Sequence, residues 1–138
     1  MNNEQLEALA QELCDTFEIY APPVPVELML RQPKENMWDE VDPSQLSGTF
    51  MNLSERFSPR MSLARLLVRH ITMSEWGKQH NLPAVIVDKE SINNFARKIL
   101  MPREMVEGLT ASMRNPTTMS THFEVPESDA EERLLEMS

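Results

Sequence analysis

Apolar residues recur at helical spacing along most of the chain, and prolines mark where one segment ends and another begins. In residues 3–19 apolar side chains return every three or four positions, and acidic residues occupy the other face, which predicts an amphipathic helix. The run YAPPVPVE at 20–27 ends this helix, because proline lacks the amide hydrogen that a helix interior needs. Pro25 suits the first turn of a second, short helix in PVELMLR.

The segment 32–58 has the weakest periodicity. Turn signals lie at 42–44 and 47–48, where Asp, Pro, Ser and Gly cluster. The letters MW at 37–38 and GTFMNL at 48–53 suit short strands. The pattern therefore predicts a small antiparallel sheet in this part of the chain.

The remaining segments begin at helix-start signals. Ser58 and Pro59 suit the cap and the first position of a helix that we expect to reach about Gln79. AVIV at 84–87 fits either a short strand or a buried lead-in. Later helices are expected to start at a capping residue or a proline: Asp88, Pro102, Pro116 and Pro126.

These elements predict one domain over residues 1–138, with 116–138 as a helical C-terminal subregion. The expected fold class is α+β, mostly helical with a small antiparallel sheet. The length of 138 residues and the 41% of apolar residues are enough for one core.

Composition narrows the function classes. Three glycines leave no glycine-rich phosphate loop, and the single Cys14 excludes an internal disulfide and a cysteine-rich zinc site. Cys14 is expected on the buried face of the first helix. The sequence shows no signal peptide and no apolar run of membrane-spanning length, so we expect a cytoplasmic protein without membrane contact.

Charge is unevenly distributed within the net charge of −9. Residues 59–103 hold 8 basic and 3 acidic groups, whereas 1–58 hold 3 and 11 and 104–138 hold 2 and 8. An acidic chain is unsuited to binding DNA alone. The basic middle either binds an anionic partner or packs against its own acidic flanks, and we favour the second interpretation.

Four stretches resemble, in order and rough spacing, segments of one known family. They are PPVPVE at 22–27, SPRMSLARLLVRHI at 58–71, NNFARKILMPREMV at 93–106 and FEVPESDAEERLLEM at 123–137. The second resembles the active-site helix of the ImmA/IrrE zinc metallopeptidases, and the third, the most specific match, resembles the family pattern ANRFAAELLMPREL. The resemblance implies a zincin-like α+β domain. Several members cleave helix-turn-helix repressors in phage, mobile-element or stress-response settings.

The family's zinc chemistry depends on H-E-x-x-H, with two His ligands one turn apart and a Glu as general base. The alignment places Arg65 and Arg69 at the two histidines and Leu66 at the glutamate. The third family ligand, a glutamate, corresponds to Ser91. Arginine stays protonated and leucine cannot act as a base, so the resemblance implies a scaffold without metal, cofactor or catalytic residues.

Each candidate residue also has a structural interpretation. Arg65 and Arg69, one turn apart, suit an anion or acidic-peptide site, or ion pairs with Glu75 or Glu90, which we favour. His70 is expected to be a core histidine with a backbone partner.

Two further features of the sequence are acidic. DEVD at 39–42 is typical of a solvated turn. Residues 116–137 resemble a helix-turn-helix in outline, but an acidic second helix would be repelled by phosphates. This end of the chain is expected to pack or to dock a protein.

We therefore expect a non-catalytic ImmA/IrrE-like protein of bacterial or phage origin. It would act as a protein-binding or regulatory module toward a transcription regulator or another protein of its operon or mobile element. Two other classes stay open: a hydrolase or peptidase with an altered active site, and a structural or dimerising protein.

Overall fold

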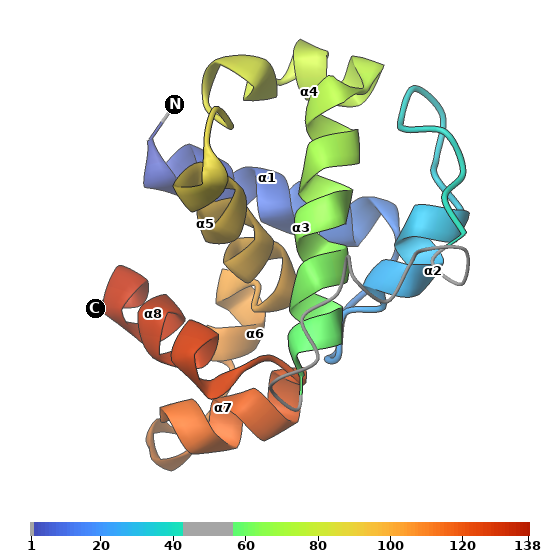
Figure 1. Cartoon of the computed structure of the whole chain (residues 1–138). Coiled ribbons are helices and arrows are strands. Elements are labelled where there is room, and N and C mark those ends of the chain that lie inside the picture. Colours follow the sequence, from blue (N-terminus) through green and yellow to red (C-terminus); the bar gives the residue numbers. More distant parts are fainter. Residues whose placement is uncertain (1, 43–56) are drawn as a thin grey trace.

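The described part of the chain is built from helices (Figure 1). The computed structural model describes residues 2–42 and 57–138. In order, the helices are α1 (Asn3–Thr16), α2 (Val26–Arg31), α3 (Ser58–Met73), α4 (Glu75–Gln79), the 3-10 turn η3 (Leu82–Ala84), α5 (Lys89–Leu100), α6 (Arg103–Glu107), the 3-10 turn η4 (Ala111–Met113), α7 (Pro116–Phe123) and α8 (Glu127–Met137). These residues contain no strand, so the expected α+β class with a small antiparallel sheet is wrong, and the fold is all-α. The candidate strand at 48–53 lies outside the described residues.

Two segments with strand-like sequences form turns instead. The Met37 amide donates to the Lys34 carbonyl at 3.1 Å, and the Ile86 amide donates to the Leu82 carbonyl at 2.8 Å. A strand needs its backbone groups to bond a neighbouring strand. Here these amides bond carbonyls three or four residues earlier, which turns the chain back on itself.

The helix α3 runs through the middle of the molecule (Figure 1). It packs against α2, α4 and α5, while α1 also packs on α5. Its fully buried residues meet those of α5 in one core, and the two helices contribute Leu67, Val68, Ile71, Phe95 and Ile99 to it. Burial of such side chains is the main favourable term in folding. One face of α3 is thereby used for the core.

The helix predicted to reach Gln79 is broken after Met73. Ser74 has an extended backbone, with φ −77° and ψ 166°, and caps α4 by accepting the Gly77 amide at 3.1 Å. Its hydroxyl donates to the Ile71 carbonyl at 2.6 Å. Serine side chains compete in this way with the helix backbone, so they favour helix starts over helix interiors. The start of α3 differs by one residue, since Ser58 is already helical.

Buried charges fix the C-terminal helix. Arg133 of α8 is fully buried, and its guanidinium donates to both carboxylate oxygens of Glu7 in α1, at 2.6 and 2.7 Å. Its Nε donates to the Met101 carbonyl at 3.0 Å. Such bidentate pairs combine charge with fixed geometry. The single cation of an otherwise acidic helix therefore holds α8 against the core.

Four of the eight basic residues in 59–103 form ion pairs with acidic residues of the flanking segments 1–58 and 104–138, as the charge distribution predicts. The side chain of Glu136 in α8 lies 2.7 Å from Arg97 and 3.4 Å from Lys98. The pairs that join the middle to the flanks are Arg60 with Glu27 and Glu124, Arg97 with Asp129 and Glu136, Lys98 with Glu136, and Arg103 with Glu4 and Glu7. None of the helices in the described ranges is long and apolar enough to cross a membrane.

Candidate functional site

The candidate site follows the outer face of α3, whose sequence resembles an active-site helix. Leu63 and Leu67 of this helix face the core, whereas Arg65 and Leu66 are half-buried and Arg69 is exposed. Residues four apart lie on the same helix face, so Arg65 and Arg69 are neighbours. The two positions that correspond to the family's zinc-binding histidines are therefore neighbours on this helix, but both are occupied by arginine.

Arg65 is bonded within its own helix and lies in the electrostatic field of Asp129 in α8. Its guanidinium donates to the Ser62 hydroxyl at 3.0 Å. Burial lowers the pKa of Arg65, the carboxylate of Asp129 opposes this change, and Arg69 adds to it. Within the described residues Arg65 forms no ion pair with Glu75 or Glu90, so the expected partners are wrong. Asp129 lies in another helix far along the chain, so residue spacing did not indicate it.

Arg69 is the more accessible of the two arginines. Its side chain is exposed, and no carboxylate of the described residues lies within ion-pair distance. A guanidinium in this state keeps all its donors for water or for an acidic ligand. The prediction of an anion or acidic-peptide contact at Arg65 and Arg69 therefore depends mainly on Arg69.

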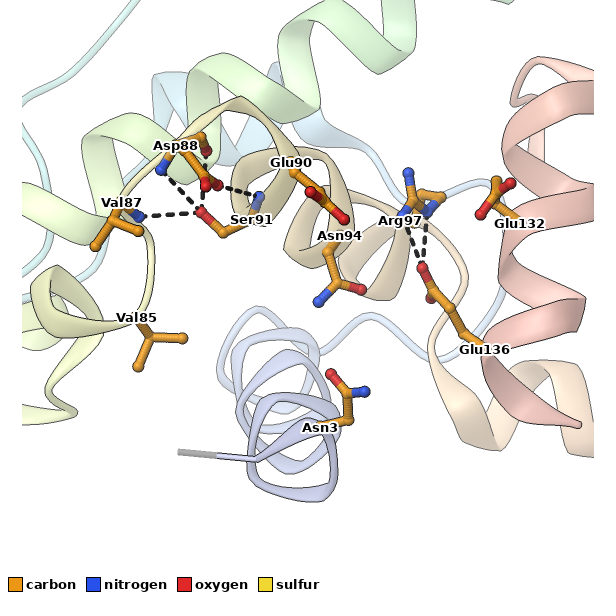
Figure 2. Close-up of a pocket in the computed structure, with 10 residues that line it drawn as sticks. All are labelled: Asn3, Val85, Val87, Asp88, Glu90, Ser91, Asn94, Arg97, Glu132 and Glu136. Atoms are coloured by element: carbon orange, nitrogen blue, oxygen red, sulfur yellow. Dashed lines mark hydrogen bonds and ion pairs between the residues drawn. The ribbon is translucent and has the colours of Figure 1, made fainter.

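Ser91 is part of the capping box at the start of α5. Its hydroxyl accepts the amides of Val87 and Asp88, each at 3.0 Å, and donates to the Asp88 carbonyl (Figure 2). The Asp88 carboxylate in turn accepts the Ser91 amide at 2.8 Å, which confirms Asp88 as the predicted cap. Hydrogen bonds from the Ser91 backbone and side chain lower the pKa of Asp88. The position that corresponds to the third zinc ligand is therefore part of a capping box.

Cys14 is chemically protected. It is fully buried, and its sulfur lies 4.0 Å from the Ile99 carbonyl. Burial, and to a lesser degree the charge of Asp15, raises the pKa of the thiol to about 12. A nucleophilic cysteine needs the opposite shift. The prediction of a small apolar core residue is confirmed.

His70 is not the core histidine that the sequence predicted. It is half-buried, its imidazole bonds no backbone group in the described part of the chain, and it lines an open groove of about 370 Å³. The other lining residues are Met37, Trp38, Asp39, Met73, Ser74 and Glu75. The apolar periodicity of α3 extends to His70, but the described residues leave this end of the helix only partly covered.

A second groove lies between the start of α1, one face of α5 and α8 (Figure 2). It has a volume of about 550 Å³ and is rich in carboxylates: Asp88, Glu90, Glu132 and Glu136 line it. Arg97, which also lines it, donates to Glu136 at 2.7 and 3.0 Å. No group of three or more His, Cys, Asp or Glu side chains in residues 2–42 and 57–138 is placed to hold a metal ion.

The helices α7 and α8 at the C-terminal end pack against each other. The exposed face of α8 is acidic, because its arginine turns inward to Glu7.

Comparison of the chain with protein-family models, with curated proteins and with solved structures finds no match. The resemblance to the ImmA/IrrE family therefore stays a prediction.

Proposed function

We propose that this chain is a non-catalytic, ImmA/IrrE-like protein-binding module, acting on a transcription regulator or another protein of its operon or mobile element. The observation that carries the proposal is the set of residues at the four aligned functional positions. Arg65, Leu66, Arg69 and Ser91 supply neither the nitrogen and carboxylate ligands that zinc takes nor a general base.

The roles of these residues in the fold support the same proposal. Ser91 is engaged in the cap of α5, and Arg65 bonds Ser62 beside the charge of Asp129. Arg69 and the end of α3 are accessible to a partner. A former catalytic helix of this kind offers a binding surface without hydrolytic chemistry.

Two measurements test the proposal. Zinc content of the protein purified from its native host is expected to be far below one ion per chain, and no peptide bond of a co-purified partner is expected to break. Intact-mass spectrometry of the partner before and after incubation reports the second point. Stoichiometric zinc that is lost in His70→Ala, or a cleaved partner, would contradict a non-catalytic role.

A further inference from the structure

The groove at the end of α3 combines an exposed methionine, Met73, with two exposed carboxylates, Asp39 and Glu75. We name it the methionine groove and define it by Met37, Trp38, Asp39, His70, Met73 and Glu75. Met73, an apolar side chain, is 68% exposed. Methionine is flexible and polarisable, and it adapts to partner side chains of different shapes.

Hydrogen bonds hold the two walls of the groove together. The Trp76 amide at the start of α4 donates to the Asn36 carbonyl at 2.7 Å, which ties α4 to the turn that carries Met37 and Trp38. The Trp38 indole donates to the Leu30 carbonyl at 3.2 Å and stacks on Phe17. A surface that is already fixed loses less conformational entropy when it binds a ligand.

The charges beside the groove are not neutralised by the described parts of the protein. Asp39 and Glu75 are exposed, and neither has an ion-pair partner in residues 2–42 and 57–138. By contrast, Glu7 and Glu136 are paired with buried cations. Free carboxylates beside an apolar surface complement lysine or arginine next to an apolar side chain.

The positive charge of Arg69 weakens the electrostatic attraction of the groove for a cationic ligand. Arg69 lies one turn before Met73 on α3, so the field at the groove is mixed rather than uniformly acidic. A purely cationic ligand would be repelled by Arg69 as well as attracted by Asp39 and Glu75. Binding therefore requires the apolar contact in addition to the charge.

We propose that the methionine groove binds a basic segment of a partner protein, in which one large apolar side chain stands next to lysine or arginine. The apolar side chain would lie on Met73 and Met37, and the cation would pair with Asp39 or Glu75. This inference rests on the proposed function, because it names the surface and the chemistry by which a protein-binding module would act.

The larger groove of Figure 2 serves as the comparison. It carries more carboxylates, and its apolar lining consists of Val85 and the exposed Val87, without a methionine or an aromatic ring. Glu136 in its wall is already bonded to Arg97. Attraction of a basic peptide to acidic charge in general would favour this larger groove. Anchoring on a flexible methionine side chain rather than on valine favours the methionine groove.

The test uses a fluorescein-labelled synthetic peptide of leucine and lysine that is amphipathic as a helix. Its affinity is measured by fluorescence anisotropy in physiological salt. A second peptide, with glutamate in place of lysine, is expected not to bind. Met73→Gln and the pair Asp39→Asn with Glu75→Gln are each expected to weaken binding of the basic peptide about tenfold.

Matched controls change the same chemistry elsewhere. Leu135→Gln removes an apolar side chain that is 63% exposed on α8, and Glu90→Gln with Glu132→Gln removes two carboxylates of the larger groove. Both are expected to change the affinity by less than about twofold. All changed side chains are on the surface, and circular dichroism checks that each variant keeps the helical content of the parent.

Each outcome decides for or against the methionine groove. Equal weakening by both pairs of carboxylate changes, or no binding by the parent, overturns it. A change of oligomeric state in Met73→Gln, seen by size-exclusion chromatography, also overturns it and assigns the groove to a second copy of the chain. Zinc measured on the same samples is independent of these results, so it tests the proposed function separately.

Discussion

At the scale of single residues, burial decides which groups of this protein are reactive. Cys14 is fully buried, and burial raises the pKa of its thiol to about 12. Thiolates, not thiols, are the nucleophiles. A thiol with this pKa is ionised to only about one part in ten thousand at pH 8. The single thiol of the sequence is therefore unreactive while the chain is folded.

Modification of Cys14 by an aromatic disulfide reagent should require unfolding. In native buffer at pH 8 we expect almost no release of the coloured thiolate, and in concentrated urea one equivalent per chain. Absorbance against time measures both. Rapid, complete reaction of the native protein would contradict the buried position of Cys14.

At the scale of elements, the break between α3 and α4 depends on a close approach of two backbones. A Cβ atom built on Gly77 would lie 2.0 Å from the Ile71 carbonyl oxygen and 2.8 Å from that of Thr72. No side chain fits at such distances, so α4 can fold onto the end of α3 only with glycine at 77. The same junction carries one wall of the methionine groove.

Gly77→Ala should therefore destabilise the protein. We expect a loss of about 1–3 kcal/mol in the free energy of unfolding, because the backbones must separate. Urea denaturation followed by circular dichroism measures the change. Gly108→Ala is the control, since its Cβ would lie 3.3 Å from the Glu104 oxygen and 3.6 Å from that of Met105, and we expect a change within about 1 kcal/mol. Equal losses in both variants would contradict the role of the junction.

Sequence periodicity predicted most helices but not this break. Apolar spacing continues from Ile71 to Trp76, so the pattern favours one helix up to Gln79. The break depends on the Ser74 hydroxyl and on space around Gly77, which are tertiary features.

The prediction of a strand at 37–38 was wrong for a related reason: an isolated pair of apolar residues does not specify a partner strand. At the candidate site, the residue types were readable, but the partner Asp129 and the exposure of His70 were not.

At the scale of the whole molecule, a network of charges joins the two ends of the chain. Glu7 and Arg133 are 126 positions apart and form a bidentate pair with almost no exposure. The sequence predicted that acidic flanks would meet a basic middle, but not that Arg133 would point inward. The available signal was the position of Arg133, which follows Ala130 at core-facing helical spacing.

Removal of one partner of this pair should be more costly than removal of both. Arg133→Met leaves the Glu7 carboxylate without its closest cation, and we expect a loss of about 3–5 kcal/mol in the free energy of unfolding. Adding Glu7→Met should recover part of that loss. Arg31→Met breaks an exposed pair with Asp42 and should cost less than about 1 kcal/mol. Urea denaturation of the four proteins measures these differences; a double variant less stable than Arg133→Met would contradict the prediction.

The alignment with zinc peptidases makes a prediction about the scaffold itself. Arg65→His, Leu66→Glu and Arg69→His place two nitrogen ligands and a base on one face of α3. Zinc also takes a carboxylate as third ligand and leaves its fourth position to water. Ser91→Glu would supply this ligand if α5 presents position 91 to α3, and glutamate is also compatible with the capping box at Asp88.

Comparison of the triple with the quadruple variant isolates the contribution of position 91. If the alignment is correct, the triple variant gains zinc affinity over the parent, and Ser91→Glu increases the affinity further, by roughly tenfold or more. Competition with a coloured chelator measures affinity, after circular dichroism has shown that each variant folds. Catalysis is not expected to return, because residues around the ligands must also orient them.

If both variants fold and neither binds zinc better than the parent, the positional assignment is wrong and α3 is a core helix with a coincidental sequence. If only the fourth change has no effect, the His pair is assigned correctly, and the capping bonds that hold residue 91 beside Asp88 in this structure explain why the third ligand does not form.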